Sequence, residues 1–401
     1  MEFWKKNLFI CWFGCFATAT GLSQLAPVLP LYIEHLGIQN TADIEQWSGI
    51  AFGVTFIIMA IASPIWGQAA DKYGRKPMLL RASLGMAIVI TCMGFVQNVY
   101  QLVALRLLQG AVSGFISAAI TLVATQAPKE RAGWALGTLS TGAVGGMLLG
   151  PLIGGYVAEV WGFRSVFFST GALLMVSFTA SLLFVKENFT PPAKKVLSFR
   201  EVWHLIPNPQ MMITMFITTF ILQLALLSIE PIITIYVGQL HVTSHVALIS
   251  GMIFAASGFA NILAAPQLGK LSDRIGPHKV MLVSLIAAGL LFIPQALVTN
   301  PWQLMGLRFL LGLTVGGLLP SINTLVMRNT PTSITGRAFG FNQSAQFLGS
   351  FSGSLLGGQV AANFGIHYVF FVTGALLLLN ALWVYLTVCK QVAARKQTYV
   401  S

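Results

Sequence analysis

Residues 67–77 read GQAADKYGRKP and lie between two long apolar runs. A second stretch of the same kind, GKLSDRIGPHK, occupies residues 269–279. Charged residues make up only 8% of the chain, so a charged loop of this form is conspicuous wherever it occurs. Its recurrence about 202 residues later, in a chain of 401, indicates that the protein consists of two related halves.

The amount of apolar sequence predicts a membrane protein. Hydrophobic residues make up 56% of the chain, and the mean hydropathy is +0.78. A soluble domain of this length could not hide so many apolar residues. The apolar runs are continuous, which favours helices over the alternating strands of a lipid-facing barrel. We expect an all-α protein with twelve transmembrane helices, at residues 8–33, 48–70, 78–97, 100–125, 134–160, 165–186, 211–237, 246–270, 280–299, 302–327, 336–362 and 367–389.

The basic residues predict the orientation of these helices. The net charge is +12. If both termini are cytoplasmic, all 23 Lys and Arg residues except Arg106, Arg164 and Arg308 fall in cytoplasmic segments. This distribution is the positive-inside pattern of multi-pass membrane proteins. The basic character therefore reflects topology and does not indicate nucleic-acid binding.

The sequence gives only weak indications of a cleaved signal peptide or of a metal site. The first apolar run follows Lys5 and Lys6, as in a signal peptide, but it is about 26 residues long and contains prolines, which favours a retained helix. The four cysteines lie in apolar segments without zinc-like spacing, so we expect them to be small apolar side chains. His241 and His245 are four residues apart, but in an outer loop without further ligands, so no metal site is expected.

Polar residues match between the two halves at nearly constant offsets. Shared apolar composition could not produce such matches, so we infer a duplicated six-helix unit. Because six is even, both halves keep the same orientation, and a site is expected near the midplane between them. The predicted division is an N-terminal half at 1–186, a cytoplasmic linker at 187–210, and a C-terminal half with a short cytoplasmic tail at 211–401. The matched residues are Gly67, Asp71 and Gly74 with Gly269, Asp273 and Gly276; Asn98, Gln101 and Arg106 with Asn300, Gln303 and Arg308; and Pro27 and Tyr32 with Pro231 and Tyr236.

Four motifs resemble those of the major facilitator superfamily, and specifically of its twelve-helix bacterial drug/proton antiporters. GQAADKYGRKP resembles the loop signature between the second and third helices, and RLLQGAVSG (106–114) is similar to the fourth-helix arginine motif. GAVGGMLLGPLIGG (142–155) is similar to the fifth-helix antiporter motif. APVLPLY (26–32) resembles a first-helix motif of drug exporters.

This resemblance implies a function as well as a fold. Bacterial members of this kind commonly export fluoroquinolones, dyes and other amphipathic cations in exchange for protons. We therefore expect a proton-coupled multidrug exporter of the bacterial cytoplasmic membrane that works by alternating access. Its partners would be small-molecule drugs, protons and bilayer lipid, and it would need no cofactor besides the proton gradient. We also expect a monomer that does not bind nucleic acid.

The repeated charged loop is expected to act as a cytoplasmic latch between the halves. Asp71 lies at the end of a helix, where it can meet a helix N-terminus or an arginine, and the resemblance implies Arg75 as one partner. Gly67 and Gly74 permit a tight turn and close backbone approach. The alternative is that the basic residues only set the orientation, which explains neither the aspartate nor the glycines. The second copy retains Asp273 but lacks the Arg-Lys pair, so a weaker latch is expected there.

A stripe of small residues on the predicted fifth helix is the second candidate for gating. Residues at a spacing of four lie on one helix face, where small side chains allow close packing in lipid. Tight packing alone and a gating role both fit this pattern, and the association with antiport comes from the resemblance. The stripe consists of Gly142, Gly146, Gly150 and Gly154, with Pro151 inside it, and it recurs without the proline at Gly349, Gly353 and Gly357.

Glu230 is the acidic residue that lies most clearly within a predicted helix. A charged group inside a membrane is costly unless it is paired or hydrated, and such groups are commonly functional. The duplication aligns Glu230 with Ala26, so the acid is a departure from the repeat. It suits proton uptake and release, and its charged form could attract a cationic drug. The alternatives are a fixed hydrogen bond or a position wetted from the outer surface.

Arg106 resembles the fourth-helix arginine that is associated with proton coupling. An arginine does not release its own proton in a protein, so its role would be electrostatic control of a nearby acid or water. The alternative is structural, with the guanidinium anchoring neighbouring helices through backbone carbonyls. Arg308 is its repeat equivalent and is expected to be more structural. No second membrane acid is evident, which leaves the proton route open.

Drug-binding residues are inferred from polar and aromatic side chains within the helices. Such sites are mainly apolar with a few placed polar groups. Each candidate could instead form an interhelical hydrogen bond or face lipid. The candidates are Gln24, Phe220, Gln223, Asn261, Asn323, Asn342, Gln343, Gln346 and Phe347.

The sequence leaves alternatives to drug export. An enzyme is not expected, because the sequence has no catalytic constellation and no G-x-x-x-x-G-K-[ST] phosphate loop. A lipid or glycolipid flippase would need a laterally open cavity. A proton-coupled nutrient importer would need a more polar and selective site, and a sensor would show no substrate flux.

Overall fold

The computed structural model describes residues 3–128, 131–189, 203, 205–240, 244–331 and 334–389, and within them it contains helices and no strand. Most of the predicted linker and the end of the predicted tail lie outside the described residues. The helices are α1 (Phe3–Ser23), α2 (Leu25–His35), α3 (Thr41–Tyr73), α4 (Arg75–Met93), α5 (Val99–Val112), α6 (Phe115–Gln126), α7 (Ala132–Trp161), α8 (Phe163–Phe184), α10 (Pro209–Ile229), α11 (Ile233–Gln239), α12 (Val246–Ile275), α13 (Pro277–Gln295), α14 (Pro301–Val315), α15 (Leu318–Arg328), α16 (Thr335–Phe364) and α17 (Ile366–Val384), followed by a π-helical turn at Tyr385–Cys389.

The length and hydropathy of these helices are those of a multi-pass membrane protein. In the described part of the chain, ten helical stretches are long and apolar enough to cross a bilayer, and the bent pair α1–α2 adds an eleventh. The predicted segment 336–362 is observed as α16, which has 30 residues. It is not among these stretches, because its many glycine, serine and amide residues lower its mean hydropathy. The all-α membrane class is therefore confirmed, while the twelfth span stays a prediction.

Four predicted segments are each observed as two helices. α1 and α2 meet at Gln24 with a bend of 42°, and α10 and α11 are separated by residues 230–232. α5 and α6 are separated by residues 113–114, and α14 and α15 by residues 316–317. Hydrophobicity does not reveal such breaks, because the residues on both sides are equally apolar. The breaks occur in corresponding helices of the two halves.

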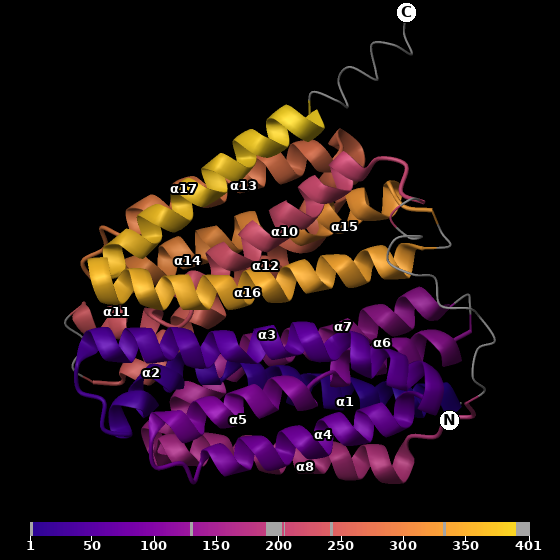
Figure 1. The fold of residues 1–401 in the computed structure, drawn as a ribbon, viewed down its shortest axis with the longest axis horizontal. Coiled ribbons are helices and arrows are strands. Elements are labelled where there is room, and N and C mark those ends of the chain that lie inside the picture. Colours follow the sequence, from indigo (N-terminus) through magenta and orange to yellow (C-terminus); the bar gives the residue numbers. More distant parts are fainter. Residues whose placement is uncertain are drawn as a thin grey trace, which may run out of the picture. The chain divides into compact units, whose positions relative to one another are not determined.

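The chain forms two compact units. Unit 1 comprises Met1–Ala193 and Ile233–Ala255, and unit 2 comprises Lys194–Ile232 and Ala256–Ser401. In unit 1, α1 packs along α7, α3 along α5 and α4 along α8. In unit 2, α10 packs along α16 and α13 along α17 (Figure 1). Residues 233–255, which follow the predicted linker, are thus part of unit 1, and the predicted division of the chain stays a prediction.

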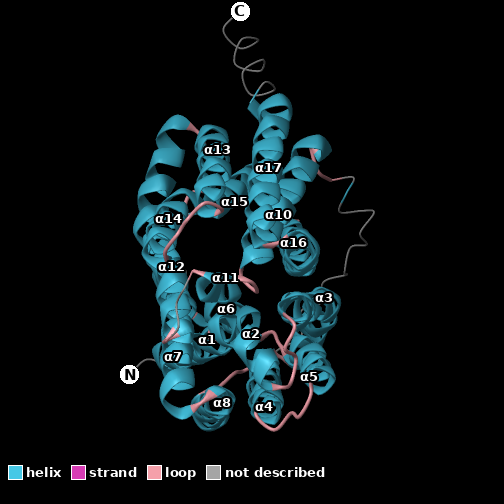
Figure 2. Ribbon diagram, turned by 90° about the vertical axis from the view of Figure 1, so that its left-hand side faces the viewer, coloured by secondary structure: helices cyan, strands magenta, loops and turns pink. Residues whose placement is uncertain are grey.

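The short helix α11 connects this late segment to the beginning of the chain within unit 1. It lies beside α2 (Figure 2). The Thr234 hydroxyl donates to the Pro27 carbonyl at 3.2 Å. Further along, α12 packs closely on α7, because Gly155 faces the backbone of Ala247 and Gly251 faces the backbone of Pro151.

One-residue turns join the longest helices to their successors. Gly74 (φ 94°) separates α3 from α4, and Gly276 (φ 100°) separates α12 from α13. Glycine adopts this backbone region without a steric penalty, whereas other residues rarely do. This explains why the repeated loop has a glycine at the same place in each copy. α3 has 33 residues, and α7, α12 and α16 have 30 each.

Matched polar residues form matched helix caps. The Asn98 side chain accepts from the Gln101 backbone N–H at 3.0 Å, and the Gln101 side chain accepts from the Gln97 N–H at 2.9 Å. In the second half, Asn300 accepts from the Gln303 N–H at 2.9 Å, with the Gln303 side chain returning to Thr299. Each is a capping box whose return bond goes to the residue before the N-cap instead of to the N-cap itself. Local structure therefore agrees with the duplication inferred from the sequence.

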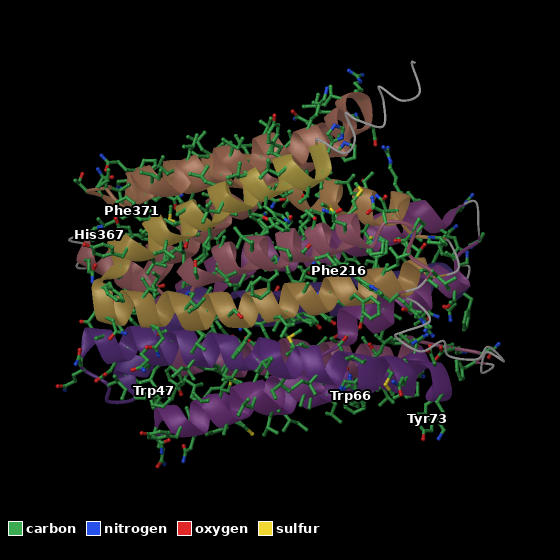
Figure 3. All side chains as sticks on the ribbon, turned by 45° about the horizontal axis from the view of Figure 1, so that its top comes forward. Trp47, Trp66, Tyr73, Phe216, His367 and Phe371 are labelled. Atoms are coloured by element: carbon green, nitrogen blue, oxygen red, sulfur yellow. The ribbon has the colours of Figure 1, made fainter. Side chains whose placement is uncertain are left out.

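The break between α5 and α6 is filled by two side chains from other helices. Trp66 of α3 donates its indole N–H to the Ala111 carbonyl at 2.7 Å. Arg81 of α4 donates to the Ser113 carbonyl at 2.8 Å, and its guanidinium lies over the Trp66 ring at 3.6 Å. These bonds satisfy carbonyls that the interrupted helix cannot pair. Trp66 and Tyr73 lie toward one end of α3, and Trp47 toward the other (Figure 3).

Candidate functional site

Glu230 lies where α10 ends, inside a segment long and apolar enough to cross a membrane. Pro231 follows it and has no N–H, so the helical ladder is interrupted, and the Ile232 N–H bonds to the Ile229 carbonyl instead. The carboxyl is partly buried and has no hydrogen bond or ion pair within the described residues. Discontinuous membrane helices commonly form the binding sites of transporters. The acid thus lies at a break of this kind.

Arg308 of α14 belongs to the same unit as Glu230 and acts on it electrostatically. Glu230 is thus an unpaired acid with a buried positive charge nearby. The alternative of a fixed hydrogen bond is not observed within the described residues.

Arg106 of α5 is 2% exposed, and its side chain bonds within unit 1. Its Nε donates to the Ala51 carbonyl of α3 at 2.8 Å, and its Nη1 donates to the Gln109 side chain at 2.6 Å. The guanidinium also lies 5.4 Å from the centre of the Phe52 ring. Thr55 of α3 returns a bond to the Arg106 carbonyl at 3.0 Å. This geometry corresponds to the structural alternative, in which the arginine holds α3 to α5.

The loop at 67–77 contains the ion pair that the resemblance implied. Arg75 donates to the Asp71 carboxylate across one turn, and the aspartate remains more than half exposed. Gly67 has open space around it. In the second copy, Asp273 is exposed near the end of α12. The role of this loop as a latch between the halves stays a prediction.

A residue that sequence reasoning missed stabilises the same loop. Gly74 precedes α4 and has no side chain with which to cap it. Glu187, which follows α8, accepts instead from the backbone N–H groups of Arg75 (2.8 and 2.9 Å) and Lys76 (2.7 Å). A carboxylate at this position also interacts favourably with the helix dipole. Glu187 is 112 residues from Arg75 in sequence, so no local pattern could have indicated the contact.

Replacing Glu187 by alanine should weaken this turn measurably. Loss of a helix cap costs about 1 kcal/mol, and we expect faster hydrogen exchange at the Arg75 and Lys76 amides together with a lower melting temperature. Glu187→Gln keeps an acceptor and should lie between the wild type and the alanine variant. Equal exchange at both amides in all three proteins would show that the carboxylate does not act as the cap.

The small-residue stripe lies at the close contact between α7 and α1. A Cβ added at Gly142 would lie 2.5 Å from the Trp12 carbonyl oxygen, and one at Gly154 would lie 2.5 Å from that of Gln24. Gly146 and Gly150, between them, also face the α1 backbone or the Ser23 side chain. The stripe therefore serves tight packing, and its further role in gating stays a prediction. In unit 2, Gly349, Gly353 and Gly357 face α10 in the same way.

The comparisons with known proteins agree with this architecture. A family model described as Major Facilitator Superfamily matches residues 11–255 and 215–398. The chain belongs to the Major Facilitator Superfamily. This membership supports the expectation of a transporter rather than an enzyme.

Full-length relatives within the Major Facilitator Superfamily are close in sequence. The chain is 48% identical over 396 residues to multidrug resistance protein MdtG of Klebsiella pneumoniae (strain 342), covering 98% of this chain and 96% of the relative. It is 49% identical over 382 residues to multidrug resistance protein MdtG of Salmonella typhimurium (strain LT2), covering 95% of each.

Solved structures show the same fold at low sequence identity. A bacterial homologue of the human lysosomal transporter Spinster superposes with a TM-score of 0.82 at 13% identity, covering 96% of this chain and 97% of that one. The nucleoside transporter NupG superposes with a TM-score of 0.76 at 15% identity, covering 96% and 99%. At these identities the likeness concerns the fold alone.

Two of the predicted substrate-binding residues form an interhelical network in unit 2. Thr219 of α10 donates to the Asn342 side chain of α16 at 2.7 Å, and Asn342 donates to Asn323 of α15 at 3.4 Å. Gln24 is also engaged, with its amide donating to the Val166 carbonyl at 3.3 Å. These three residues therefore have structural partners that compete with a role in drug binding.

The other predicted substrate-binding residues are more accessible. Gln343 is exposed and donates to Gln346 of the same helix at 3.1 Å. Each of the remaining side chains is partly buried within unit 2; they are Phe220, Gln223, Asn261 and Phe347.

A second acid inside a membrane helix was missed because the predicted segment began at residue 48. The observed helix α3 begins at Thr41, which places Glu45 inside it with 4% exposure. Asn40 caps α3 by accepting from the Ala42 N–H at 3.0 Å, and Asp43 follows in the first turn. An asparagine followed by first-turn acids is a helix-start signal that could have placed this boundary correctly.

Proposed function

We propose that this protein exports amphipathic drugs, including fluoroquinolones and cationic dyes, across the bacterial cytoplasmic membrane in exchange for protons. The observation that carries the proposal is Glu230, an unpaired and partly buried carboxyl at a helix break within a predicted membrane span. An ionisable group in such a place is costly unless it is paired or hydrated, and such groups are commonly functional. The sequence identity of 48–49% to proteins named multidrug resistance protein MdtG supports drugs as the exported substrates.

The proposed cycle uses alternating access of two halves to a central site. Glu230 takes a proton from the outer side as the drug leaves, and it releases the proton on the inner side so that the next drug can bind. The Asp71–Arg75 pair and its loop hold one state closed on the cytoplasmic side. The proton gradient supplies the energy, and the protein acts as a monomer without a cofactor.

Two rivals on the same fold are a lipid or glycolipid flippase and a proton-coupled importer. Purified protein should release protons when norfloxacin or ethidium is added, and proteoliposomes should move both drugs faster when a proton gradient is imposed. Drug binding without proton release, together with transport of lipid, would favour the flippase. Uptake of a polar nutrient in the direction of the gradient would favour the importer.

A further inference from the structure

Two arginines occupy equivalent places in the duplicated halves but have different surroundings. Arg106 lies on α5 and Arg308 lies on α14. One turn further along, Gly110 packs on the backbone of α3 and Gly312 packs on the backbone of α12. Because the helix contacts match, the difference between the two arginines comes from the side chains beside them. The repeat therefore provides an internal comparison.

The difference is whether the guanidinium is paired. Arg106 uses its Nε and Nη1 on Ala51 and Gln109, as described above. Arg308 is 5% exposed, yet within the described residues its Nε and Nη2 have no hydrogen-bond partner. At the place of Gln109 the second half has Leu311, which is fully buried and has no acceptor. Buried donors without partners cost about 1–3 kcal/mol each, so such an arrangement calls for an explanation.

The two unpaired donors lie on one edge of the guanidinium. Nε–H and one N–H of Nη2 point in parallel, which is the geometry that binds both oxygens of a carboxylate. A single water or carbonyl oxygen could accept from both donors only through bent bonds, whereas the two oxygens of a carboxylate accept one each. A carboxylate is therefore the acceptor that best matches this edge of Arg308.

Among the described residues of unit 2, the carboxyl that acts electrostatically on Arg308 is that of Glu230. Two positions depart from the repeat: the first half has Ala26 in place of Glu230 and Gln109 in place of Leu311. The half that has the acid is thus the half whose arginine lacks an amide partner. The acid at residue 230 and the arginine without an amide neighbour are therefore complementary: one can accept the hydrogen bonds that the other has free to donate.

Two other arginines on the helices packed against α10 lie away from Glu230. Arg337 is in the first turn of α16 and Arg328 ends α15, and both lie beside the start of α10 rather than its end. His367 and Tyr368 are near the start of α17, which packs at the end of α10, because Ser228 and Thr373 share a hydrogen bond at 2.9 Å. The His367 ring bonds to the Ala296 carbonyl, and Tyr368 is exposed. Arg308 is the group whose charge acts on Glu230.

We propose that the Nε–Nη2 edge of Arg308 binds the Glu230 carboxylate after it has lost its proton, and that the open edge corresponds to the protonated acid. The proposal rests on the proposed function, because it makes Arg308 a positioning residue for proton release. In the step, the O–H bond of Glu230 breaks, the proton passes to water, and the carboxylate accepts two N–H bonds from Arg308. Reprotonation reverses the step and frees the edge.

The test is an infrared titration of the full-length protein in detergent without drug. The band of the protonated carboxyl that disappears in Glu230→Gln reports Glu230 alone. In Arg308→Gln the neutral acid should persist to higher pH, because the charge that favours the carboxylate is gone. The midpoint should rise by roughly one to three pH units, the range expected for removal of a close opposite charge. A midpoint equal to that of the wild type would overturn the proposal.

Two matched variants at residue 311 provide a second test in case Arg308→Gln does not fold. Leu311→Gln places an amide acceptor beside Arg308, as Gln109 accepts from Nη1 of Arg106 in the first half. This amide competes with Glu230 for the guanidinium, so the midpoint should rise in the same direction by less. Leu311→Met has similar volume without an acceptor and should leave the midpoint unchanged. Equal midpoints for the two variants would contradict the proposal.

A drug carboxylate is the other possible source of the same chemistry. Norfloxacin has a carboxylate, and ethidium has none. If Arg308→Gln weakens norfloxacin binding but leaves ethidium binding and the Glu230 titration unchanged, the edge belongs to the drug and the proposal is wrong. Because the titration needs no drug, absence of drug-driven proton release would count against the proposed function and not against this inference.

Discussion

Replacing Glu230 by glutamine should abolish drug-driven proton release while leaving drug binding measurable. Glutamine has nearly the same shape and can still form hydrogen bonds, but it cannot lose a proton. Glu230 lies at the break after α10 and has no fixed partner within the described residues, so the substitution should not disturb packing. Proton release after addition of norfloxacin should fall from about one proton per protein, the capacity of a single carboxyl, to none.

The matched control is Glu34→Gln, which changes an exposed acid at the end of α2. Its proton release should equal that of the wild type. Transport in proteoliposomes should show the same contrast, with the Glu230 variant no longer responding to an imposed proton gradient. Undiminished proton release from Glu230→Gln would move the coupling to another acid, and Glu45 would be the first to examine.

Replacing Gly146 by alanine should strongly destabilise unit 1. A Cβ at this position would meet the carbonyl of Phe16 and the side chain of Ala19 on α1, neither of which can move without shifting the helix. Overpacking of this kind costs about 1–3 kcal/mol. The neighbouring Gly145 is the matched control, because a Cβ there would lie 3.7 Å from the Phe16 ring, at ordinary contact distance.

Thermal unfolding in detergent checks this prediction. Alanine has a higher helix propensity than glycine, by about 1 kcal/mol, so Gly145→Ala should leave the melting temperature unchanged or raise it. Gly146→Ala should lower it. If both variants melt alike, the close approach of α7 and α1 does not depend on the stripe.

The sequence was sufficient for the helical membrane class and indicated the duplication, and it singled out Glu230, whose role stays a prediction. Continuous apolar runs and matched polar residues are local signals, and Glu230 is conspicuous because its surroundings are apolar. The capping boxes at Asn98 and Asn300 show why those residues matched: each begins a helix in its half.

The contacts could not be predicted, because they join residues that are distant in the sequence. Nothing near Gly74 indicates that Glu187 would cap the helix after it. Arg106 and Arg308 have similar local sequences, yet only the structure shows that one is paired and the other has an open edge. Glu45 was missed for a different reason, since apolarity alone begins the segment about two turns too late.

The lengths of α3, α7, α12 and α16 determine where their ends must lie. At about 1.5 Å per residue, helices of 30–33 residues are roughly 45–50 Å long. The hydrocarbon of a bilayer is only about 30 Å thick, so these helices must tilt or project into the headgroups and the water. Moderate tilting alone does not absorb such an excess. Their terminal turns, including those at Gly74 and Gly276, are therefore assembled in an aqueous or interfacial medium, and a change in bilayer thickness should move the lipid boundary along the helices without straining the turns.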